Sequence, residues 1–461
     1  MELNHTHAPT ARSWIAEANA AGADFPIQNL PLGVFRRAGS QEAFRGGIAI
    51  GEQVLDLGAL AASDALAGLA RQAARAAAQP VLNDLFALGP AAWRALRHGV
   101  FALLKEEEGT PGAARADAVR ACRDCLVPQS AIEHALPARV GDYTDFYTSF
   151  DHAQSSARMV DPAAQVAANF RAMPIGYHGR ASTVAVSGQA FHRPWGQNKM
   201  PWEAPPALYR PTRWLDYELE VAAWVGQGNR VGQPVPLAQA EEHLFGLGLL
   251  NDWSARDTQI WEMAPLGPFL AKSFATTVSP WIVTMEALAP YRTPWRHADE
   301  EPAPQPYLTT AANARAGAID LRLEVWLQTG ENRVEGARAT RLSQTNFSHQ
   351  YWTLAQMLTH HTSGGCSLQP GDLLGSGTVS GPAPEEAGCL LELTCGGRAP
   401  LRLNGGEQRT FLQDGDTVLL RGWCEAPGRP RIGFGECRGT VLPAIPAPMS
   451  SNAQTQEHFH A

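Results

Sequence analysis

A polar segment between two β-prone runs carries residue types that could do chemistry. Apolar residues 247–250 precede the segment, and the β-branched run at residues 276–278 ends it. Large apolar residues such as Trp253 and Phe274 would bury much of it and force its charges to find partners. We therefore predict a functional site rather than a loop of solvated charges, with these candidates: Asp252, Arg256, Gln259 and Lys272.

Glu218 and Glu220 lie two residues apart in the run YELEV, residues 217–221. In a strand their side chains would share a face with Ala222 and Trp224. Two buried carboxylates side by side repel each other unless a cation lies between them. The pattern thus predicts a metal, and a solvent-facing strand edge is the alternative.

The run GDYTDFYTSFDH, residues 141–152, mixes Asp145 with aromatic residues and ends at His152. This mixture suits a metal and substrate loop, and an aromatic turn with a capping Asp is an equal alternative. Hard cations such as Mg²⁺ and Ca²⁺ prefer several oxygen ligands, often from distant segments. No His pair at zinc spacing is present, which disfavours zinc. An all-carboxylate set is available: Asp145, Glu218, Glu220 and Asp252.

Glu392 is the single acid in the apolar run CLLELTC, residues 389–395, which predicts a strand. A buried Glu beside a His forms a general-base arrangement, in which the acid orients the imidazole. His152 is a candidate partner, although the sequence alone does not pair the two. The chain has no G-x-S-x-G motif, no P-loop and no dinucleotide fingerprint, so covalent serine or cysteine catalysis is not supported.

Composition bounds the class of protein. A chain of 461 residues with 44% hydrophobic and 18% charged residues is expected to be globular and to form two domains. The net charge of −8 and the absence of a basic stripe argue against a nucleic-acid partner. No apolar run could cross a membrane, and the first residues do not resemble a signal peptide. We expect a cytoplasmic protein without a membrane partner.

Three segments are expected along the chain. Residues 13–125 begin with short β-prone runs and continue from about residue 63 as Ala-rich helices, and residues 128–446 form a larger, mostly β domain. Within this domain, residues 243–250 and 351–362 are the best helix candidates. Residues 1–12 and the tail 447–461 are predicted to be disordered. Of seven cysteines, Cys122 and Cys125 form a lone C-x-x-C, interpreted as two thiols at a helix end, with a redox or zinc role as the alternative.

Several motifs follow one another in this order: GDYTDFY, IGYHGRAS, LDYELE, NDWSARD, PLGPFLAKSF and QPGDLLGSGTVSGP. In form and order, over about residues 139–446, the chain resembles the fumarylacetoacetase family. The resemblance implies a mostly β fold with some α. A small SH3-like β-barrel N-terminal domain would precede a large mixed β-sandwich roll, and the protein would be a homodimer.

The implied activity is metal-dependent hydrolysis of a C–C bond in a β-diketone that carries two carboxylates. The substrate would be 4-fumarylacetoacetate and the products fumarate and acetoacetate, in the last step of tyrosine and phenylalanine degradation. One alternative is an acylpyruvate hydrolase or a related keto-acid hydrolase or isomerase. A second is an inactive binding protein on this fold.

The resemblance also implies roles for single residues, with Mg²⁺ and/or Ca²⁺ as the cofactor. His152 would be the general base and Glu392 would orient it. Arg256, Gln259 and Lys272 would stabilise the oxyanion. The metal ligands would be Asp145, Glu218, Glu220 and Asp252, with Lys272 and Thr276 beside a second cation. Substrate contacts would come from Tyr147, Tyr177, Gln259 and Thr378. Two positions depart from the family pattern: Asp161 replaces an Arg and Met263 replaces a Tyr, both at substrate contacts, and Arg158 lies close to the first.

Overall fold

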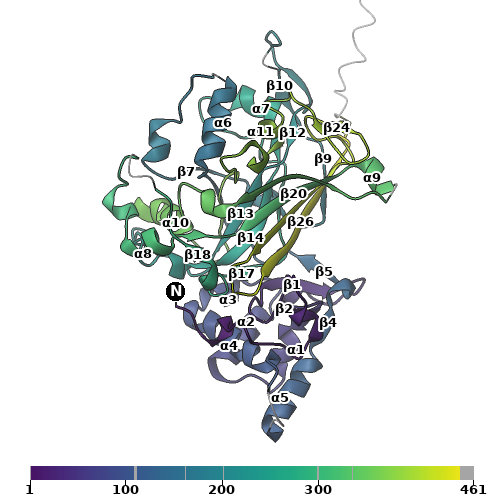
Figure 1. Cartoon of the computed structure of the whole chain (residues 1–461), viewed down its shortest axis with the longest axis vertical. Helices are drawn as coiled ribbons and strands as arrows, with labels where there is room; N and C mark the ends of the chain where they lie inside the picture. Colours follow the sequence, from purple (N-terminus) through teal and green to yellow (C-terminus); the bar gives the residue numbers. More distant parts are fainter. Residues whose placement is uncertain are drawn as a thin grey trace, which may run out of the picture.

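The computed structural model describes residues 2–107, 112–160, 162–200, 202–297, 301–334 and 336–446. The fold mixes α-helices with twisted β-sheets (Figure 1). The predicted disorder of the tail 447–461 and the departure at Asp161 fall outside the described residues.

The N-terminal part is an antiparallel five-stranded sheet in the order β4-β3-β2-β1-β5, covered by helices (Figure 1, purple). Its strands are β1 (Leu32–Arg37), β2 (Arg45–Ile50), β3 (Gln53–Asp56), β4 (Leu126–Pro128) and β5 (Ile132–Ala135). The helices lie between β3 and β4 and are α1 (Leu57–Ala62), α2 (Gly68–Ala77), α3 (Asn83–Ala87), α4 (Pro90–Leu104) and α5 (Ala113–Arg123). Ala has the best helix propensity, and α2 to α5 confirm the helices predicted from about residue 63, whereas α1 precedes that stretch and was not predicted.

The prediction that the first residues are disordered was wrong for residues 2–12. A short 3-10 helix, His5–His7, is capped by Asn4, whose side chain accepts a bond from the Thr6 N–H. Thr6 and His7 are buried. The His7 ring nitrogen Nε2 lies 2.8 Å from the carbonyl oxygen of Glu286. Polar residues order here because a later part of the chain supplies their partners.

An eight-stranded mixed sheet forms the centre of the molecule, in the order β7-β6-β22-β13-β14-β16-β8 with β17 paired to β14. Its strands are β6 (Tyr143–Tyr147), β7 (Ile175–His178), β8 (Val184–Val186), β13 (Leu219–Val225), β14 (Leu244–Asp252), β16 (Thr276–Val278), β17 (Val283–Thr284) and β22 (Leu373–Gly375).

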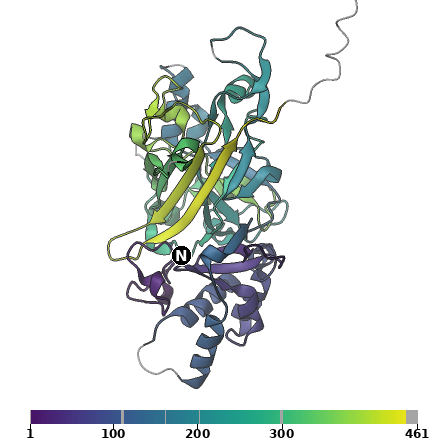
Figure 2. The ribbon, with the colours of Figure 1, turned by 90° about the vertical axis from the view of Figure 1, so that its right-hand side faces the viewer.

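A second sheet of the C-terminal part, in the order β21-β20-β25-β26-β9, packs against the eight-stranded sheet. Leu249 of β14, Leu323 of β20 and Leu420 of β25 belong to one hydrophobic cluster, so the two sheets share a core. Figure 2 shows the long strands β25 and β26 (yellow) above the N-terminal part (purple). The strands are β9 (Gln189–His192), β20 (Arg322–Gln328), β21 (Thr340–Asn346), β25 (Thr417–Cys424) and β26 (Ile432–Leu442).

Short strand pairs and helices complete the second part. The pairs are β10 (Trp195–Asn198) with β11 (Leu208–Pro211), β12 (Leu215–Asp216) with β15 (Ser254–Ala255), β18 (Arg292–Thr293) with β19 (Ala318–Ile319), and β23 (Leu401–Arg402) with β24 (Gln408–Arg409). The helices are α6 (Phe150–Val160), α7 (Arg256–Glu262), α8 (Ala311–Ala316), α9 (Gly330–Val334), α10 (Leu354–Ser363) and α11 (Leu390–Leu393).

Strand β13 is buried on both faces. Leu219 and Val221 belong to the core shared with the second sheet, whereas Ala222 and Trp224 pack in the cluster that contains the N-terminal helices. The predicted alternation along this run is therefore confirmed. Glu220 shares the face of Ala222 and Trp224.

Two predictions of element type were wrong. Residues 243–250 are not a helix but part of β14, and at Gly246 an added Cβ would lie 2.4 Å from the Val283 carbonyl oxygen of β17. Periodicity cannot identify a strand that is apolar on both faces. Residues 389–395 are not a strand, because the backbone N–H groups of Leu390 and Leu391 bond to Asp216 at the start of α11. The helix predicted at residues 351–362 is confirmed as α10.

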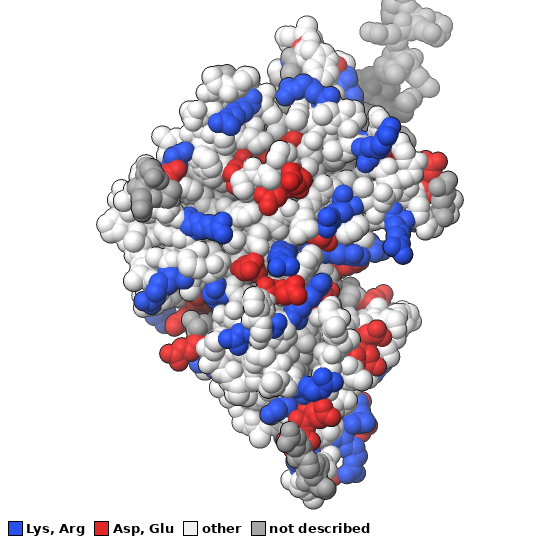
Figure 3. Space-filling view, in the orientation of Figure 1, with Lys and Arg blue, Asp and Glu red and all other residues white. Residues whose placement is uncertain are grey.

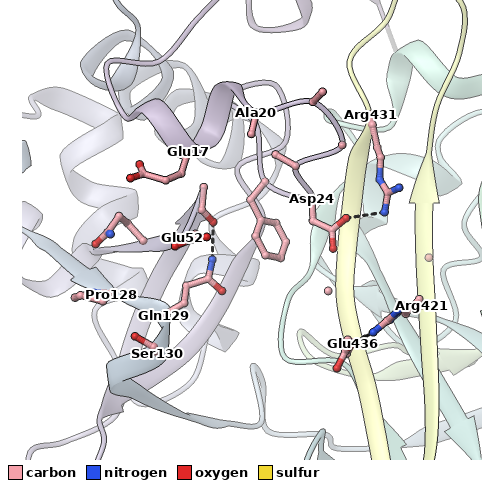
Figure 4. Close-up of a pocket in the computed structure, with 18 residues that line it drawn as sticks. Glu17, Ala20, Asp24, Glu52, Pro128, Gln129, Ser130, Arg421, Arg431 and Glu436 are labelled. Carbon is pink, nitrogen blue, oxygen red and sulfur yellow. Dashed lines mark hydrogen bonds and ion pairs between the residues drawn. The ribbon is translucent and has the colours of Figure 1, made fainter. Parts of the chain in front are cut away.

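A cavity of about 730 Å³ lies where the N-terminal part meets β25 and β26. Figure 4 shows Asp24 paired with Arg431 across this junction, at 2.9 Å, and Arg421 paired with Glu436. None of the predicted site residues lines the cavity, so it is not the candidate active site.

On the face seen in Figure 3, Lys and Arg are scattered among Asp and Glu, and one group of acidic side chains gathers near the upper centre. Among the described residues, no helix combines the length and apolar character needed to cross a bilayer.

Candidate active site

Four buried carboxylates meet within the eight-stranded sheet. Asp145 lies on β6, Glu218 directly precedes β13, Glu220 lies on β13, and Asp252 ends β14. One ligand oxygen of each lies within 4.8 Å of the others. Since β22 joins β6 to β13 and β13 pairs with β14, the sheet order brings together acids that are far apart in sequence.

Two cations partly neutralise this cluster. Lys272 Nζ lies 2.7 Å from Glu218 and 2.6 Å from Asp252. Arg256 Nη1 lies 2.6 Å from the other oxygen of Glu218. Two positive side chains beside four carboxylates leave a negative site, provided that all four are ionised.

The pKa values follow from this imbalance. Burial, and then the neighbouring carboxylates, raise the pKa of Asp145 and of Glu220 well above the ordinary values. Burial alone would also raise the pKa of Glu218, but Lys272 and Arg256 hold it below its usual range. Among the described residues, ion pairs with Lys272 and Arg256 are made by Glu218 and Asp252, and not by Asp145 or Glu220.

Unpaired oxygens indicate what the cluster could hold. Asp145 Oδ1 and Glu220 Oε1 are buried and have no hydrogen-bond partner among the described residues. A buried unpaired carboxylate oxygen is costly, and a hard divalent cation with oxygen ligands would remove that cost. The residues present thus fit such a cation.

The other oxygens of the cluster are held in place. The Tyr177 hydroxyl donates to Asp145 at 2.6 Å. The Gly377 N–H donates to Glu220 at 3.1 Å, and the Thr276 hydroxyl donates to Asp252 at 3.1 Å. These bonds fix the carboxylates before any ligand arrives.

His152 and Glu392 form a buried pair beside this cluster. His152 Nδ1, on α6, lies 2.6 Å from Glu392 Oε2, on α11. The pKa of Glu392 would be raised by burial, but His152 holds it below its ordinary value. Because an ionised carboxylate only accepts, Nδ1 carries the proton and Nε2 is left as the basic nitrogen.

Arg256 and Gln259 present further donors beside Glu218. Arg256 Nη1 also donates to Gln259 Oε1 at 3.1 Å, which leaves the amide NH₂ of Gln259 as a donor. Arg256 Nη2 is buried without a partner among the described residues. An anion formed during a reaction would satisfy it.

The remaining predicted residues differ in how closely they approach these groups. The Tyr147 ring meets the His152 ring edge-on at 5.4 Å. Thr378 is buried one residue after Gly377. Met263 follows the end of α7 and is 47% exposed, so its side chain is not enclosed by the site. Arg158 is exposed and lines a cavity of about 730 Å³ together with Glu392.

Sequence reasoning missed three residues that contact the predicted ones. The Ser380 hydroxyl donates to Glu392 at 2.8 Å and the Cys389 thiol at 3.2 Å. Asp216 bonds to Arg256 at 2.9 Å. The available signal for Asp216 was the density of acids in LDYELE, where Asp216, Glu218 and Glu220 alternate. Nothing in the sequence marked Ser380 or Cys389 as partners of Glu392.

Cys122 and Cys125 lie at the end of α5, as predicted, and both thiols are free and buried. Burial raises the pKa of Cys122 to about 12 and that of Cys125 to about 11, which suppresses thiolate chemistry at this C-x-x-C.

Two family models match the chain. The one described as fumarylacetoacetate (FAA) hydrolase C-terminal matches residues 143–442, and the one described as fumarylacetoacetase N-terminal matches residues 28–137. The fumarylacetoacetase of Oryza sativa subsp. japonica is 45% identical over 430 residues, which cover 93% of this chain and 96% of that protein. That of Homo sapiens is 45% identical over 428 residues, which cover 92% and 98%.

A solved structure of a fumarylacetoacetate hydrolase from Exiguobacterium antarcticum is more distant. It aligns with a TM-score of 0.48 and 16% identity, covering 90% of this chain and 99% of that one.

Replacing Glu220 by Gln should weaken binding of Mg²⁺ or Ca²⁺ by about 100-fold or more, because loss of a mere neighbour of a metal ligand already costs about 10- to 100-fold. Calorimetric titration measures the affinity. The control is Asp142→Asn, which removes an exposed carboxylate three residues from Asp145 and should bind metal like the wild type. Unchanged affinity in Glu220→Gln would show that the cluster is not the metal site.

The raised pKa of Glu220 predicts how the metal-free protein responds to pH. An acid whose pKa is raised on folding contributes stability below its ordinary pKa of about 4.3 and loses it as the pH rises through the raised value. Between about pH 5 and pH 8, with a chelator present, the thermal unfolding midpoint of the wild type should therefore fall more than that of Glu220→Gln.

With saturating Mg²⁺, the thermal unfolding midpoint of the wild type should instead fall less than that of Glu220→Gln over the same pH range, because only the wild type has the full ligand set. Parallel curves for the two proteins in the chelator would contradict the assignment of an uncompensated charge to Glu220.

Proposed function

The chain belongs to the fumarylacetoacetase family, and from that premise we propose that it hydrolyses 4-fumarylacetoacetate to fumarate and acetoacetate, the last step of tyrosine and phenylalanine degradation. The relatives match over more than nine-tenths of the chain, which includes the acidic cluster and the His–Glu pair. The observation that carries the proposal is that these two groups lie close together: Tyr147, two residues after Asp145 on β6, meets the His152 ring edge-on at 5.4 Å.

The proposed reaction begins at His152. Its Nε2 takes a proton from water, and the resulting hydroxide adds to a keto carbon of the substrate. The negative charge of Glu392 stabilises the imidazolium that forms. A divalent cation held by Asp145, Glu218, Glu220 and Asp252 would act as a Lewis acid toward the keto oxygens.

The addition turns a keto oxygen into an alkoxide, which needs donors. We assign this role to the unpaired Nη2 of Arg256, the amide of Gln259 and the third N–H of Lys272, whose other two face Glu218 and Asp252. Each positioned donor of this kind contributes roughly 3–4 kcal/mol in other enzymes. The C–C bond then breaks, the leaving carbon receives the proton from His152, and the carboxylate product is released.

Substrate contacts are proposed for Tyr147, Tyr177, Gln259 and Thr378. Tyr147 borders His152, and the Tyr177 hydroxyl reaches both Asp145 and, at 3.3 Å, Asp252. Lys272 and Thr276 are proposed to lie beside a second cation, since both bond to Asp252. The metal is proposed to be Mg²⁺ and/or Ca²⁺, in keeping with the all-oxygen ligand set.

Finer features of the fold are also proposals. We propose an SH3-like barrel in a domain of residues 13–125, supported by the antiparallel sheet, although strands β4 and β5 of that sheet continue to Ala135. The core shared by two sheets supports a mixed β-sandwich roll in residues 128–446. A homodimer follows from the family resemblance. A cytoplasmic location, and the lack of nucleic-acid and membrane partners, stay predictions from composition.

An acylpyruvate hydrolase is the alternative that one observation favours. Met263 stands where the family has a substrate-contacting Tyr, and its side chain is half exposed. An inactive binding protein is disfavoured, because neither the carboxylate cluster nor the His–Glu pair has lost a member.

The substrate is tested by following loss of the diketone by its ultraviolet absorbance, with Mg²⁺ present. We expect kcat/KM for fumarylacetoacetate to exceed that for each of a panel of acylpyruvates by at least about 100-fold, since a site built for two carboxylates leaves polar groups unpaired when one is missing. Faster cleavage of any acylpyruvate would overturn the substrate assignment, but not the reaction class.

Replacing His152 by Ala should lower kcat by about 10²- to 10⁴-fold, the usual contribution of a general base. Metal affinity should stay within about twofold of the wild type, because His152 is not among the four carboxylate ligands. His178→Ala is the matched control, since this exposed residue ends β7 next to Tyr177 and should retain activity. Full activity in His152→Ala would eliminate it as the base.

A further inference from the structure

Asp216 joins the two halves of the candidate site, although it belongs to neither. Its side chain is completely buried at the end of β12. Oδ2 accepts from Arg256 Nε at 2.9 Å and from the Leu391 N–H at 2.9 Å. Oδ1 accepts from the N–H groups of Tyr217, at 2.9 Å, and Leu390, at 2.8 Å.

These bonds reach the residues that carry the chemistry. Arg256 presents its unpaired Nη2 on the oxyanion side. Leu390 and Leu391 are the first two residues of α11, and Glu392 is the next. The carboxylate of Asp216 thus holds both the guanidinium of Arg256 and the start of α11, the single helical turn that places Glu392 against His152.

The local sequence gives α11 little stability of its own. It has four residues, too few to be stable alone, and its N-cap, Cys389, makes no side-chain capping bond. Its first two N–H groups find their acceptor in Asp216 instead. The position of Glu392 therefore depends on a residue that is distant in sequence.

We propose that Asp216 is a positioning residue that holds Arg256 and Glu392 in register for the reaction. This inference rests on the proposed function for its kinetic consequences, and on the observed bonds for its geometry. A purely structural role is the competing explanation, because any buried Asp with four donors stabilises the fold.

Asp216→Asn keeps the shape of the side chain but loses part of its accepted hydrogen bonds. In either amide orientation, the NH₂ group would face two N–H donors, so Arg256 and Leu391 lose their acceptor or Tyr217 and Leu390 do. We expect kcat for fumarylacetoacetate to fall by about 10- to 100-fold, the usual effect of removing a residue that orients a site. KM should change less than about threefold.

Asp416→Asn is the matched control. Asp416 is also completely buried, and it accepts from Arg409 Nε at 2.9 Å, from Arg409 Nη2 at 3.1 Å and from the Gln413 N–H at 2.9 Å. It touches neither Arg256 nor α11 by any of these bonds. Both variants should lower the thermal unfolding midpoint, but only Asp216→Asn should lower kcat. An equal effect on kcat would overturn the proposal in favour of a structural role.

The His152 signal of isotope-labelled histidine in the NMR spectrum gives a readout without substrate. It should move in Asp216→Asn toward its position in Glu392→Gln and stay unchanged in Asp416→Asn. An unmoved signal in Asp216→Asn would overturn the positioning role. If the wild type did not cleave fumarylacetoacetate, the proposed function would fail, while this comparison would still decide whether Asp216 maintains the Glu392–His152 bond.

Asp216→Glu covers the case in which the Asn variant does not fold. It retains the charge but displaces the carboxylate by one methylene, so kcat should still fall at least about tenfold and the His152 signal should shift. Wild-type kcat in this variant would overturn the proposal, because the register of Arg256 and Glu392 would then not matter.

Discussion

Burial of like charges is the constraint on which the rest of this structure depends. Four buried carboxylates have ligand oxygens within 4.8 Å of one another, and such a group stays ionised only with positive partners. Lys272 and Arg256 compensate Glu218 and Asp252, whereas Asp145 and Glu220 retain oxygens without a partner. The fold thus leaves an excess of negative charge at the point where the proposed chemistry needs a cation.

Strand β13, which carries Glu220, is buried along its whole length. One face of β13 packs on the second sheet, and on the other face Ala222 and Trp224 pack in the cluster that contains the N-terminal helices. His152 comes from α6, its partner Glu392 from α11, and the donors Arg256 and Gln259 from α7, whereas Lys272 lies in the turn that precedes β16. Asp216 connects two of these helices, which turns separate elements into one site.

The sequence predicted what depends on local pattern. Alternation in YELEV identified Glu218 and Glu220 as acids close in space, and Ala-rich composition identified the N-terminal helices. It failed where distant contacts decide: β14 is apolar on both faces and was read as a helix, and α11 forms because Asp216 accepts its N–H groups. His152 and Glu392 are 240 residues apart, so only the family resemblance paired them.

The pairing of distant strands has a consequence for synthesis of the chain. Tyr143 of β6 pairs with Leu373 of β22, and Gln189 of β9 pairs with Gly439 of β26. During synthesis on a ribosome, β6 and β9 emerge long before β22 and β26, and the edges that pair with these later strands stay unpaired until then. Assembly of such non-local sheets is slow and exposes the nascent chain to aggregation. Any premature stop before β26 would therefore release an incomplete sheet, even though every catalytic candidate had already been made.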